Sequence, residues 1–80
     1  MEIFAIRLNK LLEENKITMY RLAKDLGCSK SMVINWRYGL NEPRASEVAR
    51  LAVYFDVSSD YLLGLENENG EKVSPDDVKK

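Results

Sequence analysis

Residues 18–39 read TMYRLAKDLGCSKSMVINWRYG, and this stretch decides the fold. It contains two short helical patterns that are separated by the break Gly27-Cys28-Ser29. Thr18 and Ser29 each precede one pattern, where a hydroxyl side chain can accept a hydrogen bond from a first-turn N–H. Gly27 can adopt the left-handed conformation that often ends a helix. Two helices joined by so short a turn predict a helix-turn-helix, a unit that binds DNA.

Small and apolar residues within this stretch indicate how its two helices pack. Val33 and Trp36 lie three residues apart, which places both on one inward face and favours a core role for Trp36 over base stacking. Ala23 is expected where the helices cross, because a larger side chain would push them apart. Cys28 is expected to fill the corner as a small apolar residue rather than to act in redox chemistry.

The remaining sequence predicts three more helices and a polar tail. A first helix covers residues 3–14, a fourth runs from about residue 44 to 55, and a short fifth is capped by Ser59 and ends at Gly64. The fourth helix is expected to bury Ala45, Val48, Leu51, Ala52 and Phe55. No strand pattern is evident, so the predicted class is an all-α five-helix domain over residues 1–65. Residues 66–80 are polar and predicted to be disordered, with helix-start signals at 74–77.

Composition narrows the classes of function. The 80 residues make one small domain, and the single cysteine allows no internal disulfide, which fits a cytoplasmic protein. The longest apolar run, residues 51–55, is too short for a membrane span or a signal peptide. The chain has no histidine, no glycine-rich phosphate loop and no clustered metal ligands. An enzyme is therefore not expected, and neither is a metal, a cofactor or a small-molecule ligand.

Net charge is the main argument against DNA binding. The chain carries a formal charge of -1, and its isoelectric point is about 5.4. The distribution is uneven, however, because residues 16–44 hold six basic and two acidic residues, or +4. Positive charge is thus concentrated around the predicted helix-turn-helix. Since non-specific affinity scales with phosphate contacts, that affinity is expected to be modest.

Residues 3–65 resemble the helix-turn-helix domain of the phage repressor and Cro family. The matching pieces are LAKDLGCS at 22–29, Trp36 followed by Gly39 and Pro43, and DYLLG at 60–64. The resemblance implies a five-helix bundle, similar to the DNA-binding domain of lambda repressor, that binds double-stranded operator DNA. Family members usually bind as homodimers, with the third helix in the major groove.

Several positions depart from the family pattern. Met19 stands where the family usually has a glutamine that steadies a phosphate, and Leu12 and Arg37 replace a common arginine–glutamate pair. Arg37 is expected to reach Glu13, Glu14 or a DNA phosphate instead. The loop at residues 40–42 is not basic, whereas in the family it often is.

Four side chains project from the third predicted helix, residues 30–38, on the face opposite Val33 and Trp36. Lysine can donate to guanine, asparagine can pair with adenine, serine suits several bases, and isoleucine can pack on a thymine methyl. An ordinary solvated helix surface would carry similar residue types, and only the surrounding helix-turn-helix favours base reading. The candidate base-reading residues are Lys30, Ser31, Ile34 and Asn35.

Two further surfaces are predicted. Phosphate contacts are expected near helix N-termini, whose free N–H groups attract anions, and beside the third helix; each candidate taken alone is equally well explained as a solvated side chain. These candidates are Thr18, Tyr20, Tyr38, Asn41 and Arg44, with Arg21 and Lys24 at longer range. The resemblance also implies a dimer interface on the fifth helix formed by Tyr61, Leu62 and Leu63, for which core packing is the alternative interpretation.

The sequence therefore predicts a transcriptional regulator, and a repressor rather than an activator, because blocking polymerase needs no extra surface. The alternative is a protein-interaction module on the same fold, such as an antitoxin or an antirepressor-type partner. Met19, the acidic isoelectric point and the non-basic loop favour this alternative.

Overall fold

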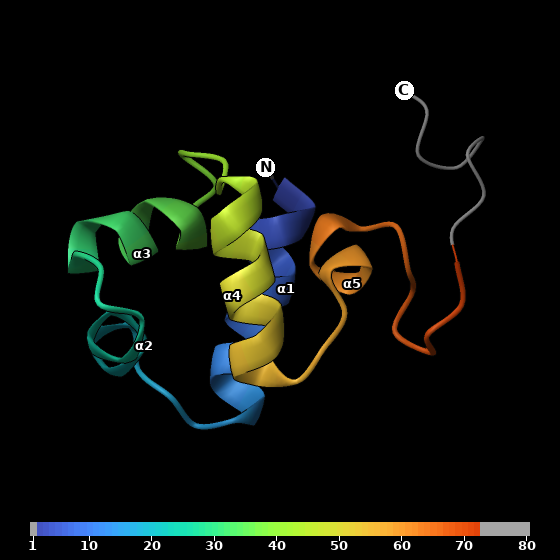
Figure 1. Ribbon diagram of the computed structural model, residues 1–80, viewed down its shortest axis with the longest axis horizontal. Coiled ribbons are helices and arrows are strands. Elements are labelled where there is room, and N and C mark those ends of the chain that lie inside the picture. Colours follow the sequence, from blue (N-terminus) through green and yellow to red (C-terminus); the bar gives the residue numbers. More distant parts are fainter. Residues whose placement is uncertain (1, 73–80) are drawn as a thin grey trace.

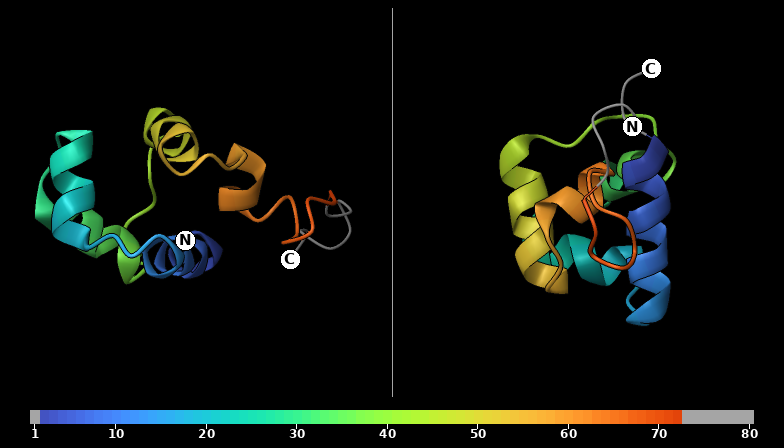
Figure 2. Two further views of the ribbon diagram at one scale, coloured as in Figure 1. Left: turned by 90° about the horizontal axis from the view of Figure 1, so that it is seen from below. Right: turned by 90° about the vertical axis from the view of Figure 1, so that its right-hand side faces the viewer.

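The structure is a computed structural model that describes residues 2–72, and within them it contains five helices (Figure 1). These are α1 (Glu2–Glu14), α2 (Met19–Leu26), α3 (Lys30–Arg37), α4 (Ala45–Phe55) and α5 (Ser59–Leu63). Helices α1 and α4 run across the middle of the molecule, with the α2–α3 pair at one end and α5 at the other (Figures 1 and 2). The predicted all-α five-helix class is confirmed.

The ends of α2 and the start of α3 follow the sequence signals. The Thr18 hydroxyl accepts a hydrogen bond from the Arg21 N–H at 3.0 Å, and the Ser29 hydroxyl accepts one from the Met32 N–H at 3.2 Å. Gly27 ends α2 with φ at 69°, in the left-handed region. A Cβ at Gly27 would meet nothing within 4 Å, so the backbone conformation, not a lack of space, favours glycine there.

Two expectations about helix starts are wrong. Ser58, not Ser59, caps α5, because its hydroxyl accepts from the Tyr61 N–H at 3.0 Å and Ser59 is already helical. Ala45 is exposed, although the sequence predicts it in the core. It is the first residue of α4, directly after Arg44, and the buried residues of this helix begin at Val48.

All five helices contribute to a single hydrophobic core. Each supplies at least one side chain that is fully buried: Phe4, Leu8, Leu22, Val33, Leu51 and Leu62. Trp36 is 2% exposed, and its ring packs edge-on against Phe4 with centroids 6.2 Å apart. The core role predicted for Trp36 is confirmed, and its ring is not available to stack on bases.

Residues 66–72 form a closed turn, although the sequence predicts disorder from residue 66. An antiparallel bridge joins Glu66 to Lys72, and the Asn67 side-chain oxygen accepts from the N–H groups of Asn69 and Glu71 at 2.9 Å each. The turn is held by polar contacts to α1 and α5 and not by burial of apolar surface, and composition reports only the second. The expectations for residues 73–80, including the signals at 74–77, lie outside the described residues.

Across residues 2–72, no helix combines the length and the apolar character that a membrane crossing requires.

Candidate nucleic-acid interface

A small residue, Ala23, is buried in α2 just before the turn that leads into α3. Ala23 is 4% exposed, and its carbonyl oxygen accepts a hydrogen bond from the Cys28 N–H at 3.0 Å. Cys28 is half-buried against the core, and this burial raises the pKa of its thiol. A protonated thiol is a poor nucleophile, so Cys28 serves packing at the corner, as predicted.

Substituting Ala23 with leucine should overpack this contact. Ala23 is 4% exposed, so a leucine there must displace its buried neighbours, and we expect Ala23→Leu to lower the free energy of unfolding by about 1–3 kcal/mol. Urea unfolding followed by circular dichroism measures the change, with the exposed Ala45→Leu as a matched control. Equal stability of the two variants would mean that α2 and α3 do not cross at Ala23.

Helix α3 has a buried face and a face toward solvent, as the sequence predicts. Val33 and Trp36 are buried, whereas Lys30 and Ser31 are exposed. Ile34 and Asn35 are half-buried. Within residues 2–72 the side-chain amide of Asn35 forms no hydrogen bond, so its donor and acceptor are free for another molecule.

The loop after α3 returns to the end of that helix. The Asn35 carbonyl oxygen accepts from the N–H groups of Leu40 at 2.8 Å and Asn41 at 3.4 Å. Asn41 is thereby kept next to α3, where it is exposed. Tyr38 is 66% exposed directly after the helix. The backbone therefore places two predicted phosphate-binding residues beside the predicted base-reading ones.

On α2, Tyr20 is also 66% exposed, and it lies against α3. The Lys30 ammonium is 5.9 Å from the centroid of the Tyr20 ring, within the range of a cation–π interaction. Thr18 is exposed next to them, although its hydroxyl oxygen already caps α2. Tyr20, predicted to contact a phosphate, therefore lies beside Lys30, predicted to read a base.

At the start of α4, a carboxylate occupies the position where a phosphate was expected. The Glu47 side chain accepts a hydrogen bond from the Arg44 N–H at 2.7 Å. A carboxylate at a helix N-terminus competes with other anions for the same N–H groups and for the helix dipole. Any phosphate contact here must therefore come from the exposed Arg44 side chain and not from the helix terminus.

Arg21 is engaged within the protein. Its Nε donates to both carboxylate oxygens of Asp25, at 2.9 and 3.2 Å, and the Tyr54 hydroxyl donates to the same carboxylate at 2.6 Å. The hydrogen bond from Tyr54 lowers the pKa of Asp25, with Arg21 acting in the same direction. The pKa of Tyr54 is raised, chiefly by that same hydrogen bond. The sequence missed this network, which joins α2 to α4 across 29 positions.

Removing the Tyr54 hydroxyl should therefore raise the pKa of Asp25. Its pKa is depressed in the folded protein, so its contribution to stability is present above its ordinary pKa of 3.8 and is lost as pH falls through the lower folded value. Tyr54→Phe should move the carboxyl titration upward, as measured by carbon-13 NMR. Tyr38→Phe, at an exposed position, should leave the titration in place, and an unchanged pKa in Tyr54→Phe would contradict the contact.

Arg37 has a different partner from those predicted. Its Nε donates to the Asn9 side-chain oxygen at 2.6 Å, and the Asn9 amide donates back to the Arg37 carbonyl oxygen at 3.1 Å. The expectation of Glu13 or Glu14 is wrong, because Asn9 lies one turn earlier on α1, opposite the end of α3. This reciprocal pair joins α1 to α3 where the resembled family uses an arginine–glutamate pair.

The predicted dimer residues on α5 differ in burial. Leu62 is 0% exposed and belongs to the core, so it cannot contact a partner while the domain is folded. Tyr61 and Leu63 are half-buried. The Arg7 guanidinium lies 4.4 Å from the centroid of the Tyr61 ring, an interaction that the sequence did not indicate. Of the three residues that were predicted for a dimer interface, Tyr61 and Leu63 therefore remain candidates.

No group of three or more histidine, cysteine, aspartate or glutamate side chains within the described part of the chain is arranged to hold a metal ion.

The comparisons with known proteins agree with this geometry. Residues 8–62 match the model of the helix-turn-helix family HTH_3. The chain is 32% identical over 78 residues to the uncharacterized HTH-type transcriptional regulators YobD and YqaE of Bacillus subtilis (strain 168). These alignments cover 98% of this chain, 70% of YobD and 66% of YqaE.

A solved structure has the same fold. The solution structure of the SOS-response transcriptional repressor LexA from Eubacterium rectale superimposes with a TM-score of 0.78 at 26% identity. The match covers 99% of this chain and 84% of that one. A helix-turn-helix between α2 and α3, a family model that matches most of the chain and these relatives agree: the chain belongs to the HTH_3 family of DNA-binding, HTH-type transcriptional regulators.

Proposed function

We propose that this chain is a cytoplasmic repressor that binds an operator as a homodimer, with α3 in the major groove. The observation that carries the proposal is that α3 is buried on one side and faces solvent on the other. Val33 and Trp36 fix one side of the helix in the core, and the other side presents polar groups to solvent. A helix held this way can enter a groove as a rigid element without disturbing the core.

Each proposed base contact follows from side-chain chemistry. Lys30 donates to the O6 and N7 atoms of guanine, and the free amide of Asn35 pairs with N6 and N7 of adenine. Ser31 accepts or donates, and Ile34 packs against a thymine methyl. The surrounding phosphates are contacted by Thr18, Tyr20, Tyr38, Asn41 and Arg44.

Repression follows from occupancy of the operator, which needs no surface beyond the DNA-binding one. LexA of Eubacterium rectale, which shares this fold, is named as a transcriptional repressor. The dimer is proposed to use Tyr61 and Leu63 on α5. A two-fold dimer requires a palindromic site with half-sites one helical turn apart, roughly 34–36 Å.

Selection of bound sequences from a random DNA pool tests this function and reveals the operator. We expect an enriched palindrome and a binding constant that falls with salt. Titration of random duplex DNA provides the comparison, because phosphate contacts alone give salt-dependent binding to any sequence. Failure to enrich any sequence, together with no binding to random duplex at low salt, would overturn the proposal.

A protein-interaction module is the second candidate, and three side chains favour it. Arg21 is neutralised by Asp25, Glu47 occupies the start of α4, and Met19 packs against the core. Each removes a group that would otherwise hold a phosphate. This candidate predicts almost no binding to random duplex at any salt concentration, whereas the repressor should bind it modestly.

A further inference from the structure

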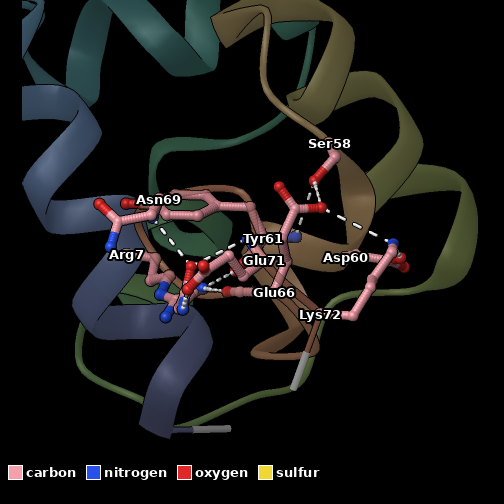
Figure 3. Close-up of polar contacts among 9 residues, drawn as sticks. Arg7, Ser58, Asp60, Tyr61, Glu66, Asn69, Glu71 and Lys72 are labelled. Carbon is pink, nitrogen blue, oxygen red and sulfur yellow. Dashed lines mark hydrogen bonds and ion pairs between the residues drawn. The ribbon is translucent and has the colours of Figure 1, made fainter. Parts of the chain in front are cut away.

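The turn formed by residues 66–72, here called the C-terminal turn, lies across α1 and α5. Seen from the α5 end of the molecule, it runs in front of α5, between α1 and α4 (Figure 2). Arg7 on α1 is its main attachment, because one guanidinium nitrogen donates to the carbonyl oxygens of both Tyr61, at 2.6 Å, and Glu66, at 2.5 Å (Figure 3). A single side chain therefore joins α1, α5 and the turn.

The other attachments are ion pairs and hydrogen bonds at the surface. Lys10 on α1 pairs with Glu68 at 2.6 Å. Lys72 pairs with Asp60 on α5, and the Ser58 hydroxyl donates to the Glu66 carboxylate at 2.9 Å (Figure 3). The turn is thus attached on both sides of Tyr61, the aromatic residue proposed for the dimer interface.

We propose that the C-terminal turn is a displaceable cover: it occupies the α1–α5 face in the monomer and leaves that face when a second copy of the chain binds there. The inference rests on the proposed homodimer through α5. It adds that monomer and dimer compete for one surface, so the contacts of the turn set how tightly the chain dimerises.

The turn is displaceable because little of it is buried. Glu66 and Asn67 are half-buried, whereas residues 68–72 are exposed. Exposed ion pairs contribute little to stability and are screened by salt. A polar hollow lined by Lys10, Tyr61 and residues 66–70 remains beneath the turn, so it spans the face without packing tightly on it.

The charges of the face fit a second copy of the same chain. Arg7 and Lys10 on α1 are basic, and Asp60 on α5 is acidic. A two-fold axis places the same patch on both partners, so that the basic residues of one copy can meet the acidic residue of the other. Such pairs would replace the intramolecular ones that the turn provides, while Tyr61 and the 38% exposed Leu65 would gain apolar contact.

A charge-neutral double variant of the full chain tests the cover. Glu68→Lys faces Lys10, and Lys72→Glu faces Asp60 and Glu66, so both attachments become repulsive while the net charge is unchanged. We expect the dimer dissociation constant, measured by sedimentation equilibrium, to fall about fivefold or more. Lys24→Glu with Glu42→Lys, an equal exchange away from the turn, should have no effect.

NMR of the wild-type chain provides the direct readout. As the concentration rises and the dimer forms, amide signals of residues 66–72 should move toward those of an unstructured peptide. A rise in the dissociation constant of the double variant would show that the turn is part of the interface and would overturn the proposal. Equal constants in all variants would overturn it too, while leaving the homodimer intact.

Two further outcomes are possible: no variant dimerises, or the charge-reversed variant does not fold. Absence of dimer in every variant, with binding to a single half-site, would contradict the homodimer itself and the cover with it. If the charge-reversed variant loses its helical circular dichroism, Glu68→Gln with Lys72→Gln removes the same pairs without repulsion. That milder variant should still dimerise more tightly than wild type, and an equal or weaker affinity would overturn the proposal.

Discussion

Leu62→Ala is expected to lower the free energy of unfolding of the monomer by about 2–5 kcal/mol. Leu62 is 0% exposed and is the one fully buried side chain that α5 supplies to the core. Truncation removes its apolar contacts and leaves a cavity, and no other side chain of the five-residue α5 is fully buried. Alanine is a good helix former, so the loss reports packing and not helix propensity.

The measurement is urea unfolding at two protein concentrations. An effect on the core is independent of concentration, whereas an effect on a dimer interface is not. Leu40→Ala, the same substitution at a residue that is 69% exposed, should change stability by no more than about 0.5 kcal/mol. A small loss at Leu62, or a loss that depends on protein concentration, would instead support the dimer interface that the family resemblance implies for this residue.

Local signals in the sequence were sufficient for most of the fold. The hydroxyl residues Thr18 and Ser29, the left-handed Gly27 and the spacing of Val33 and Trp36 each act within four residues, and each behaves as predicted. Where two adjacent residues suited the same role, as Ser58 and Ser59 do for capping α5, the pattern could not separate them. Local rules therefore gave the helices to within a residue or two.

Local sequence signals could not predict contacts between residues that are far apart in the sequence. Asn9 and Arg37 are 28 positions apart, and Arg7 and Glu66 are 59 apart. Asparagine and arginine are ordinary surface residues on their own helices, and only the packing of α1 against α3 brings these two together. The contacts of residues 66–72 could not be predicted for the same reason. A polar composition shows that little apolar surface can be buried, but it does not reveal polar contacts to another element.

The division of α3 into a buried and a solvent-facing side was predictable from the sequence, but the contacts of individual side chains around it were not. Helical periodicity alone separates Lys30 and Asn35 from the buried face of α3. It does not reveal that Arg21 is held by Asp25, or that Glu47 lies at the start of α4. Both contacts reduce the positive charge available to phosphates, so we expect sequence-specific base contacts to supply a large share of the affinity.

Asn35→Ala is accordingly expected to weaken binding to the selected operator by about 1–3 kcal/mol, with little change on random duplex. The amide of Asn35 has no hydrogen-bond partner within residues 2–72, so its loss should relax the choice at one base pair and leave the fold intact. Arg44→Ala should instead weaken binding to all sequences similarly and lower the salt slope by roughly one unit, because it removes one phosphate contact.

Comparison on both DNAs at several salt concentrations separates the two roles. Asn41→Ala, which removes the same amide from the loop after α3, serves as the matched control: it should behave like Arg44→Ala in lacking sequence preference, but with a smaller salt effect because asparagine is uncharged. Base choice is a property of groove-facing atoms, whereas salt dependence counts neutralised phosphates, so no single variant should change both. If Asn35→Ala binds operator and random duplex with unchanged affinities, α3 is not the reading helix, and the interaction-module function becomes the better account of this fold.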